Sequence, residues 1–198
     1  MIALIDYKAG NLTSVRKAFG ALGAQLFTPE RPDELASSDA IVVPGVGHFA
    51  ATKTLGPDWI NAILERVGEG RPLLGICLGM QWLYEGSEES PELPGLGLLS
   101  GRCYRLPADN VKIPHVGWNS LDFAHQNSIV DSVDNHAQVY FTHSYVAPVT
   151  GDTVAVTTHG EPFASVVQRG HVAGVQFHPE KSGDVGLQVL RNFLSLVA

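Results

Sequence analysis

The chain has 198 residues, 44% of them hydrophobic, and its 13 Lys and Arg against 20 Asp and Glu give a net charge of −7. This length suits one layered core, so we expect a single domain over residues 1–198. The sequence has no basic cluster that could bind a phosphate backbone, and no apolar run near the roughly 20 residues of a membrane span. We therefore expect neither nucleic acid nor a membrane as a partner.

Cysteine and histidine usage argues against a metal and indicates a reducing compartment. The two cysteines, Cys77 and Cys103, are not spaced as metal ligands, and the eight histidines include no His-Glu-x-x-His or His-x-His pattern. Met1 leads directly into the strand-like segment Ile2–Ile5, without the basic and apolar regions of a signal peptide. We expect no metal, no cofactor and a cytoplasmic location.

The first hundred residues alternate between strand-like and helix-like segments. The predicted strands are Ile2–Ile5, Ala24–Phe27, Ala40–Val43 and Leu73–Ile76, and the predicted helices are Leu12–Leu22 and about Asp58–Glu69. Asn11 is a suitable N-cap for the first helix and Gly23 a suitable end. This βαβα order predicts a parallel sheet with helices on both faces and ligands at the carboxyl ends of the strands. Asp6, Pro44–Gly47 and Cys77 all follow such ends, so we expect them to share one crevice.

The second half is richer in strand signals. These are Leu98–Leu106, Gln138–His143, Val154–Thr157, Ala164–Gln168 and Val172–Phe177. Residues 86–97 have the composition of a loop. A last helix follows Ser182-Gly183, with one apolar stripe formed by Leu187, Leu190, Leu194 and Val197. The whole pattern predicts an α/β fold: an open, mostly parallel sheet with extra antiparallel strands in the second half.

Cys77 lies where a buried strand meets a helix. The apolar run Leu73–Ile76 precedes it and the helix-forming run Leu78–Tyr84 follows, as at the nucleophile elbow of G-x-S-x-G hydrolases. Gly75 and Gly79 stand two residues to either side, where a sharp, strained turn leaves no room for Cβ atoms. The helix N-terminus favours a thiolate, and the N–H group of Leu78 can donate to an oxyanion, a bond worth roughly 2.7–4 kcal/mol of barrier. A buried structural cysteine is the alternative, which the paired glycines outweigh.

His178 and Glu180 can supply a base and the carboxylate that orients it. Two residues apart in an extended chain, they share a face, and Pro179 keeps its predecessor extended. A carboxylate beside an imidazole fixes the tautomer and stabilises the imidazolium. A free thiol is mostly protonated at neutral pH, so a nucleophilic cysteine needs such a base. A surface His–Glu pair is the alternative. With Cys77, the three groups predict amide hydrolysis through a thioester.

Several motifs carry a resemblance to a known family. PGVG at 44–47, GICLGMQ at 75–81 and HPE at 178–180 together resemble the class I, triad-type glutamine amidotransferases, whose fold is flavodoxin-like. More narrowly, the chain resembles the glutaminase subunits of imidazole glycerol phosphate synthases, from residue 2 to the last helix. The motifs of this narrower resemblance are DYKAGNLTSV at 6–15, PGVGHF at 44–49, KIPHVGWN at 112–119, FTHSY at 141–145 and GVQFHPEKS at 174–182.

The resemblance implies that L-glutamine is hydrolysed and its ammonia passed to a cyclase subunit in a heterodimer. The cyclase would form imidazole glycerol phosphate, for histidine, and an aminoimidazole carboxamide ribonucleotide. One alternative is an amidotransferase subunit for anthranilate or aminodeoxychorismate synthesis, or a γ-glutamyl hydrolase; DYKAGN and PHVGWN argue against these. Another is a non-catalytic partner that keeps the site as a scaffold.

Roles follow from the resemblance position by position. Cys77 matches the nucleophile, His178 the acid and base, and Glu180 its orienter. The N–H of Leu78 matches one oxyanion donor, and the loop around Val46 matches the second, after a peptide rearrangement that a Gly-Val-Gly turn permits.

Two further sets of positions follow in the same way. Those that would hold the α-amino and α-carboxylate groups of glutamine are Gly47, Gln81, Glu89, Ser144 and Tyr145. Those that would face the cyclase are Pro114, His115, Trp118, Asn119 and Lys181, with Trp118 as an interface anchor. The family usually has glycine after DY, where this chain has Lys8. If that position needs a positive φ, lysine is strained there by about 1 kcal/mol or more.

Overall fold

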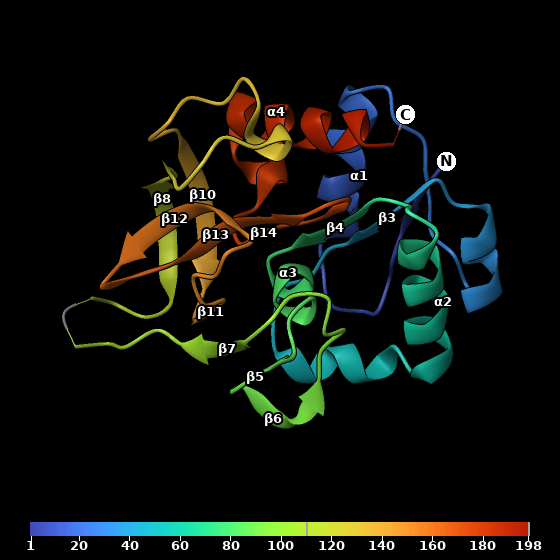
Figure 1. The fold of residues 1–198 in the computed structure, drawn as a ribbon, viewed down its shortest axis with the longest axis horizontal. Helices are drawn as coiled ribbons and strands as arrows, with labels where there is room; N and C mark the ends of the chain where they lie inside the picture. The colour runs from blue at the N-terminus through green and yellow to red at the C-terminus, as the bar shows by residue number, and fades with distance from the viewer. Residues whose placement is uncertain (110, 198) are drawn as a thin grey trace.

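A mostly parallel sheet of eight strands forms the centre of the protein (Figure 1). The structure, a computed structural model, describes residues 1–109 and 111–197. The strands are β1 Ile2–Leu4, β2 Leu26–Phe27, β3 Ala40–Val43, β4 Leu73–Ile76, β9 Asp122–Phe123, β12 Thr153–His159, β13 Glu161–Arg169 and β14 Val172–Val175. Their order is β2-β1-β3-β4-β14-β13-β12-β9, parallel from β2 to β14 and antiparallel beyond. The predicted α/β fold is confirmed.

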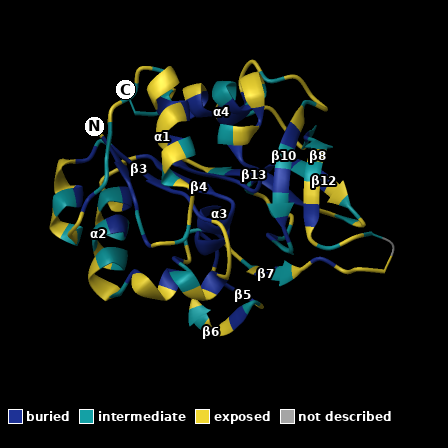
Figure 2. Cartoon of the chain, turned by 180° about the vertical axis from the view of Figure 1, so that it is seen from behind, coloured by how far each residue is buried: buried dark blue, intermediate teal, exposed yellow. Residues whose placement is uncertain are grey.

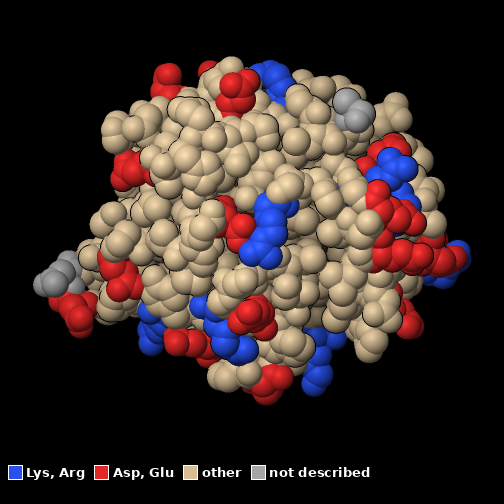
Figure 3. All heavy atoms as spheres, viewed as in Figure 1, with Lys and Arg blue, Asp and Glu red and all other residues tan. Residues whose placement is uncertain are grey.

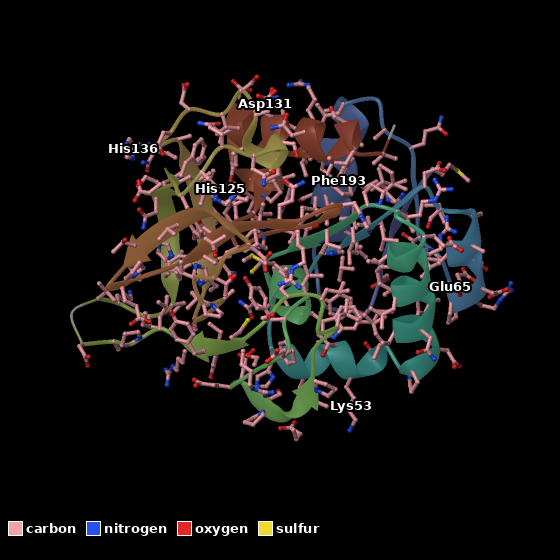
Figure 4. All side chains as sticks on the ribbon, viewed as in Figure 1. Lys53, Glu65, His125, Asp131, His136 and Phe193 are labelled. Atoms are coloured by element: carbon pink, nitrogen blue, oxygen red, sulfur yellow. The ribbon has the colours of Figure 1, made fainter. Side chains whose placement is uncertain are left out.

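Helices cover both faces of this sheet. Their bounds are α1 Leu12–Ala21, α2 Pro57–Gly68, α3 Leu78–Trp82 and α4 Gly183–Ser195. Figure 1 shows α1 and α4 on one side and α2 and α3 on the other. Separate apolar cores fill the two layers, and Figure 2 shows the central strands buried and the outer helix faces exposed. Phe193 of α4, labelled in Figure 4, packs edge-on against Phe19 of α1 at 6.3 Å between ring centroids.

Local sequence signals explain where the helices begin and end. The side chain of Asn11 accepts a hydrogen bond from the Ser14 N–H, as predicted for an N-cap, and Gly23 follows α1 with a φ of 77°. The predicted apolar stripe of the last helix does pack on the core: Leu190 is fully buried, and Leu187, Leu194 and Val197 are partly buried against it. Val189 and Phe193, which the prediction did not include, are also buried and widen this face.

Two small sheets complete the second half. One pairs β8, His115–Ser120, with β10, Gln138–His143. The other has the order β11-β7-β5-β6, and its strands are β5 Gly86–Ser87, β6 Ser90–Pro94, β7 Arg102–Arg105 and β11 Tyr145–Val146. The prediction of a loop at 86–97 was therefore wrong. Short strands rich in Ser, Glu and Pro lack an apolar alternation, so only pairing with β7 reveals them.

The surface carries mixed charge. Figure 3 shows acidic and basic side chains next to one another at several places on one face, with uncharged surface between them. Within the described residues, no helix combines the length and the apolar character needed to cross a bilayer.

Candidate active site

Cys77 stands at a strained turn between β4 and α3, as the sequence predicts. Its φ of 53° and ψ of −107° lie outside the regions that a non-glycine residue prefers. A Cβ atom on Gly75 would lie 2.6 Å from the carbonyl oxygen of Gly79, and one on Gly79 would lie 1.8 Å from that of Val43. Both flanking glycines are therefore required by close backbone packing. The helix that follows has only five residues, so its dipole acts weakly on the sulfur.

Strand pairing brings residues 176–180 to the side of Cys77. In the parallel pair β4 and β14, Gly75 lies opposite Gly174 and Ile76 opposite Val175. The N–H of Cys77 donates to the Val175 carbonyl at 2.8 Å. The two segments of the chain thus leave the sheet side by side, which brings the imidazole near the thiol although about a hundred residues separate them in the sequence.

His178 and Glu180 form a buried pair. Nδ1 of His178 lies 2.8 Å from Oε1 of Glu180, with 2% and 3% of the two side chains exposed. His178 is extended, as predicted, but Pro179–Lys181 forms a 3-10 turn, so the pair meets across a turn rather than along a strand. Burial lowers the pKa of the imidazole, but interactions with Cys77 and Glu180 raise it by more, to about 9. The site therefore favours the imidazolium.

A pocket of about 210 Å³ opens beside the thiol. All five positions predicted to bind glutamine line it, together with Cys77 and Leu78. The predicted set is Gly47, Gln81, Glu89, Ser144 and Tyr145. Pro114, predicted to face the cyclase, also lines this pocket, as do Thr142 and His143. The pocket is thus built from both halves of the chain.

Two of these side chains have fixed orientations. Glu89 is held by the N–H of Phe49, which donates to Oε2 at 2.7 Å. Nε2 of Gln81 lies 2.9 Å from the Tyr145 carbonyl and 3.1 Å from Oε1 of Gln176, two acceptors. Because both N–H bonds of that amide are used, Gln81 offers a ligand only its oxygen. An oxygen acceptor suits an ammonium group.

Both predicted oxyanion donors are engaged with backbone carbonyls in this structure. The Leu78 N–H donates to the Gly45 carbonyl at 3.3 Å, and the Val46 N–H donates to the Ala9 carbonyl at 3.0 Å. The Gly45 carbonyl and the Val46 N–H belong to one peptide group. A Cβ on Gly45 would lie 1.9 Å from the hydroxyl of Tyr7, so a side chain does not fit there.

Asp6 does not join the pocket, contrary to our expectation of one shared crevice. It lies in a separate depression with Lys8, Thr28, Glu30 and Trp59. Its carboxylate accepts hydrogen bonds from both the N–H and the Nζ of Lys8, which lower its pKa. Lys8 has a φ of 62°, so this position does adopt the positive φ that glycine would favour.

Three of the five residues predicted to face a partner, Pro114, Trp118 and Lys181, lie at an exposed patch. Trp118 and its neighbour Val116 are each 57% exposed, and Pro114 and Lys181 are exposed near them in the sequence and in the fold. Tyr140 lies edge-on to Trp118, and Nζ of Lys181 lies 5.8 Å from the Tyr140 ring. Asn119 is half-buried, and His115 is buried because the alternation of β8 turns it inward.

A chain of hydrogen bonds runs inward from Asn119. Its Nδ2 lies 3.3 Å from Nε2 of His115, whose Nδ1 lies 3.0 Å from Nε2 of His143. Nδ1 of His143 lies 3.1 Å from the Tyr145 carbonyl, the same acceptor that Gln81 uses. Burial is the main reason that the pKa values of His115 and His143 fall to about 4 and about 3. Both rings are therefore neutral at physiological pH.

Sequence reasoning missed Gln176, whose Nε2 lies 3.5 Å from the Cys77 sulfur. Its buried position follows from the pairing of β14 with β4, and no local pattern identifies it.

Among the described residues, no group of three or more His, Cys, Asp or Glu side chains is arranged to hold a metal ion.

Several solved structures share the fold of this chain. The protein described as "Crystal structure of glutamine amidotransferase" matches with a TM-score of 0.77 and 22% identity, covering 100% of this chain and 99% of the other. The glutaminase domain of a Trypanosoma brucei CTPS with bound acivicin matches with a TM-score of 0.63 and 18% identity, covering 98% and 93%. At these identities the likeness shows the fold alone.

Sequence relatives are closer and cover the whole chain. A protein of Lactiplantibacillus plantarum named imidazole glycerol phosphate synthase subunit HisH is 46% identical, over 100% of this chain and 97% of the relative. Proteins of the same name from Halalkalibacterium halodurans and Methanothermobacter thermautotrophicus are 43% and 40% identical, over 100% of this chain and 96% and 99% of theirs. The family model described as "Glutamine amidotransferase class-I" matches residues 3–196. The chain therefore belongs to the class I glutamine amidotransferase family.

Proposed function

We propose that this protein is the glutaminase subunit of an imidazole glycerol phosphate synthase. It hydrolyses L-glutamine and passes the ammonia to a cyclase subunit, with which it forms a heterodimer. The observation that carries the proposal is the pocket beside Cys77, lined by every residue predicted to hold glutamine. The name shared by relatives that are 40–46% identical favours this function over an amidotransferase that serves anthranilate or aminodeoxychorismate synthesis.

The reaction uses the triad in two halves. His178 holds the proton of the Cys77 thiol, and the resulting thiolate attacks the side-chain amide carbon of glutamine; the C–N bond breaks as the imidazolium gives its proton to the departing ammonia. This leaves a thioester between Cys77 and the glutamyl group. His178 then takes a proton from water, whose oxygen attacks the thioester; the C–S bond breaks, glutamate leaves, and the Cys77 thiolate and the imidazolium are restored. Glu180 holds the imidazole in the tautomer that presents Nε2 to the sulfur, since Nδ1 faces its carboxylate.

Activation requires rotation of the Gly45–Val46 peptide. In the present conformation the Gly45 carbonyl accepts the Leu78 N–H bond, and an oxyanion cannot use that donor. Rotating this one peptide by about half a turn would release the Leu78 N–H and turn the Val46 N–H toward the sulfur. Because one movement supplies both donors, the peptide is a switch between a resting and an active site. Each donor is worth roughly 2.7–4 kcal/mol of barrier.

The cyclase docks on the patch around Trp118. This surface combines Val116 and Trp118, both more than half exposed, with Tyr140 and the cationic Lys181. Large exposed aromatic side chains are typical anchors of protein interfaces. The patch adjoins the pocket because Pro114 precedes β8 and Thr142 belongs to β10, and both line the pocket. We place the complex in the cytoplasm, where a free nucleophilic thiol is kept reduced.

The proposal is tested by separating glutamine hydrolysis, assigned to this subunit, from the use of ammonia, assigned to the cyclase. In the heterodimer, Cys77→Ala is expected to abolish glutamine-dependent turnover and to keep turnover with added ammonium salt. Cys103→Ala is the matched control, since Cys103 is a second buried thiol outside the pocket, and it is expected to keep both activities. Equal loss of both activities in Cys77→Ala would contradict the proposal. So would full glutamine-dependent turnover without the thiol.

A further inference from the structure

The side chain of Gln176 is completely buried beside the nucleophile, where no catalytic role has been assigned to it. It follows Val175, which pairs with Ile76, so it stands level with Cys77 across two parallel strands. Its Nε2 lies 3.5 Å from the sulfur. The Thr142 carbonyl oxygen lies 3.9 Å from the same sulfur. Besides this amide donor and carbonyl acceptor, the sulfur interacts with the His178 imidazolium, the charged group of the site, and with the buried Tyr7 hydroxyl.

The orientation of the Gln176 amide is determined by its neighbours. Nε2 of Gln81 is fixed between the Tyr145 carbonyl and Oε1 of Gln176. If the Gln176 amide were reversed, its NH₂ group would face that of Gln81, and its oxygen would face the sulfur. The backbone carbonyl of Tyr145 therefore sets the direction of both amides, and Gln176 turns an N–H bond toward Cys77.

This arrangement distinguishes the two protonation states of the nucleophile. A thiol can donate to the Thr142 carbonyl, whereas a thiolate can only accept and is repelled by that oxygen. The Gln176 N–H is a hydrogen-bond donor that strengthens when the sulfur carries charge. It also holds the sulfur beside the pocket, at a residue whose backbone is strained.

We propose that Gln176 is a positioning residue that holds the Cys77 sulfur and stabilises its thiolate, and that Gln81 keeps it in that orientation. The proposal rests on Cys77 being the nucleophile of the proposed glutaminase. It also gives Gln81 two tasks, since the same amide presents its oxygen to the pocket and orients Gln176.

Alkylation of Cys77 by iodoacetamide, followed by peptide mapping across a pH series, tests this without glutamine or a cyclase. In Gln176→Met, which keeps the length and removes the donor, the rate–pH curve is expected to move up by about one pH unit, a roughly tenfold lower rate at pH 7. Gln168→Met is the matched control. Gln168 also makes several hydrogen bonds, but they join it to Ser128, Ile129 and Gly170. Its curve is expected to stay in place.

A second variant covers the case in which Gln176→Met fails to fold. Gln81→Met leaves Gln176 present but free to rotate, and a smaller shift in the same direction is expected. An unchanged curve in a folded Gln176→Met protein would overturn the proposal, as would equal shifts in Gln176→Met and Gln168→Met. If the rate–pH curve shifts but the heterodimer has no glutaminase activity, the proposed function fails while the role of Gln176 toward the sulfur stands. If the shift is absent but the heterodimer hydrolyses glutamine, the role of Gln176 fails while the proposed function stands.

Discussion

The buried pairing of His178 with Glu180 decides how the acid and base of this site behave. Desolvation alone would favour a neutral imidazole, yet Cys77 and Glu180 together reverse that preference and raise the pKa of His178 to about 9. The imidazolium is therefore the resting form at neutral pH. That form is the one required to protonate departing ammonia, so the sulfur and the carboxylate together prepare the ring for the first half of the reaction.

Glu180→Gln is expected to lower both the rate and the upper pH limit of glutamine hydrolysis. Activity of the normal heterodimer should fall as the pH rises through about 9, where His178 loses its proton. Without the carboxylate the pKa of His178 falls, so the alkaline limb of kcat/KM should move to lower pH, with kcat reduced about 100-fold or more. Measuring kcat/KM between pH 6 and 10 checks this. Glu92→Gln, on exposed strand β6, is the control, and an alkaline limb that stays in place in Glu180→Gln would contradict the assignment.

At the scale of elements, the elbow exists because the helix after Cys77 packs directly against two strands. Gly79 lies against the backbone of β3, and Gly75 lies against the first turn of α3. This contact is what brings the turn into its strained conformation, since the backbone of α3 can approach the sheet only where side chains are missing. The nucleophile is therefore positioned by main-chain packing.

Gly79→Ala should destabilise the protein because its Cβ would lie 1.8 Å from the Val43 carbonyl oxygen. The expected loss is about 1–3 kcal/mol or more of unfolding free energy, measured by urea denaturation. Gly20→Ala is the matched control. It lies in α1 with no atom within 4 Å of its added Cβ, and it should stabilise the protein by about 0.5–1 kcal/mol. Equal effects of the two substitutions would show that packing at the elbow is not tight.

The sequence predicted best the strands that are buried along their whole length, and predicted least well the strands that depend on long-range pairing. Ala40–Val43 and Leu73–Ile76 were predicted with their observed bounds, because runs buried on both faces are unbroken apolar segments. His115–Ser120 was not predicted as a strand, since its exposed face carries Val116 and Trp118 and its buried face carries a histidine. Apolar side chains on the exposed face and a histidine on the buried face match neither the unbroken apolar run of a buried strand nor the usual alternation of a half-exposed one.

The same distinction applies to the site. Cys77, with glycines on both sides, could be predicted because the elbow is a local structure. Gln176 could not, because only the register of β14 against β4 brings its amide to the sulfur. The engagement of the Leu78 N–H by the Gly45 carbonyl was equally beyond sequence patterns, since it depends on which way one peptide faces.

At the scale of the whole molecule, a cluster of two buried histidines and the half-buried His159 joins the small sheet to the large one. His115 of β8 stacks on His159 of β12 at 4.0 Å between ring centroids, and it lies edge-on to His143 of β10. Phe141 and Phe163 complete the packing around these rings. Because the hydrogen bonds of the cluster end at Tyr145, the stability of this junction and the geometry of the pocket depend on the same neutral rings.

This cluster should make the protein sensitive to mild acid. Unfolded histidines have a pKa near 6.5, whereas burial holds the pKa of His115 at about 4 and that of His143 at about 3; His159 lowers the first further, and His115 lowers the second. Below pH 6.5 the unfolded chain therefore binds protons at these two histidines, whereas the folded protein does not. Stability should fall by about 1.4 kcal/mol per histidine for each pH unit down toward pH 4. His178, whose pKa is raised, contributes stability that is fully present below pH 6.5 and is lost progressively as the pH rises from there through about 9.

Urea denaturation between pH 4.5 and 7.5 measures this slope. In His115→Gln the loss of stability per pH unit is expected to be smaller by about 1.4 kcal/mol, because one of the two buried rings can no longer take up a proton on unfolding. The control is His125→Gln, at an exposed position labelled in Figure 4, which should leave the slope unchanged. The comparison depends on slopes, so a general destabilisation by His115→Gln does not affect it. Identical slopes in His115→Gln and the unmodified protein would mean that the ring is charged in the folded state, and the neutral hydrogen-bond chain to Tyr145 would then be wrong.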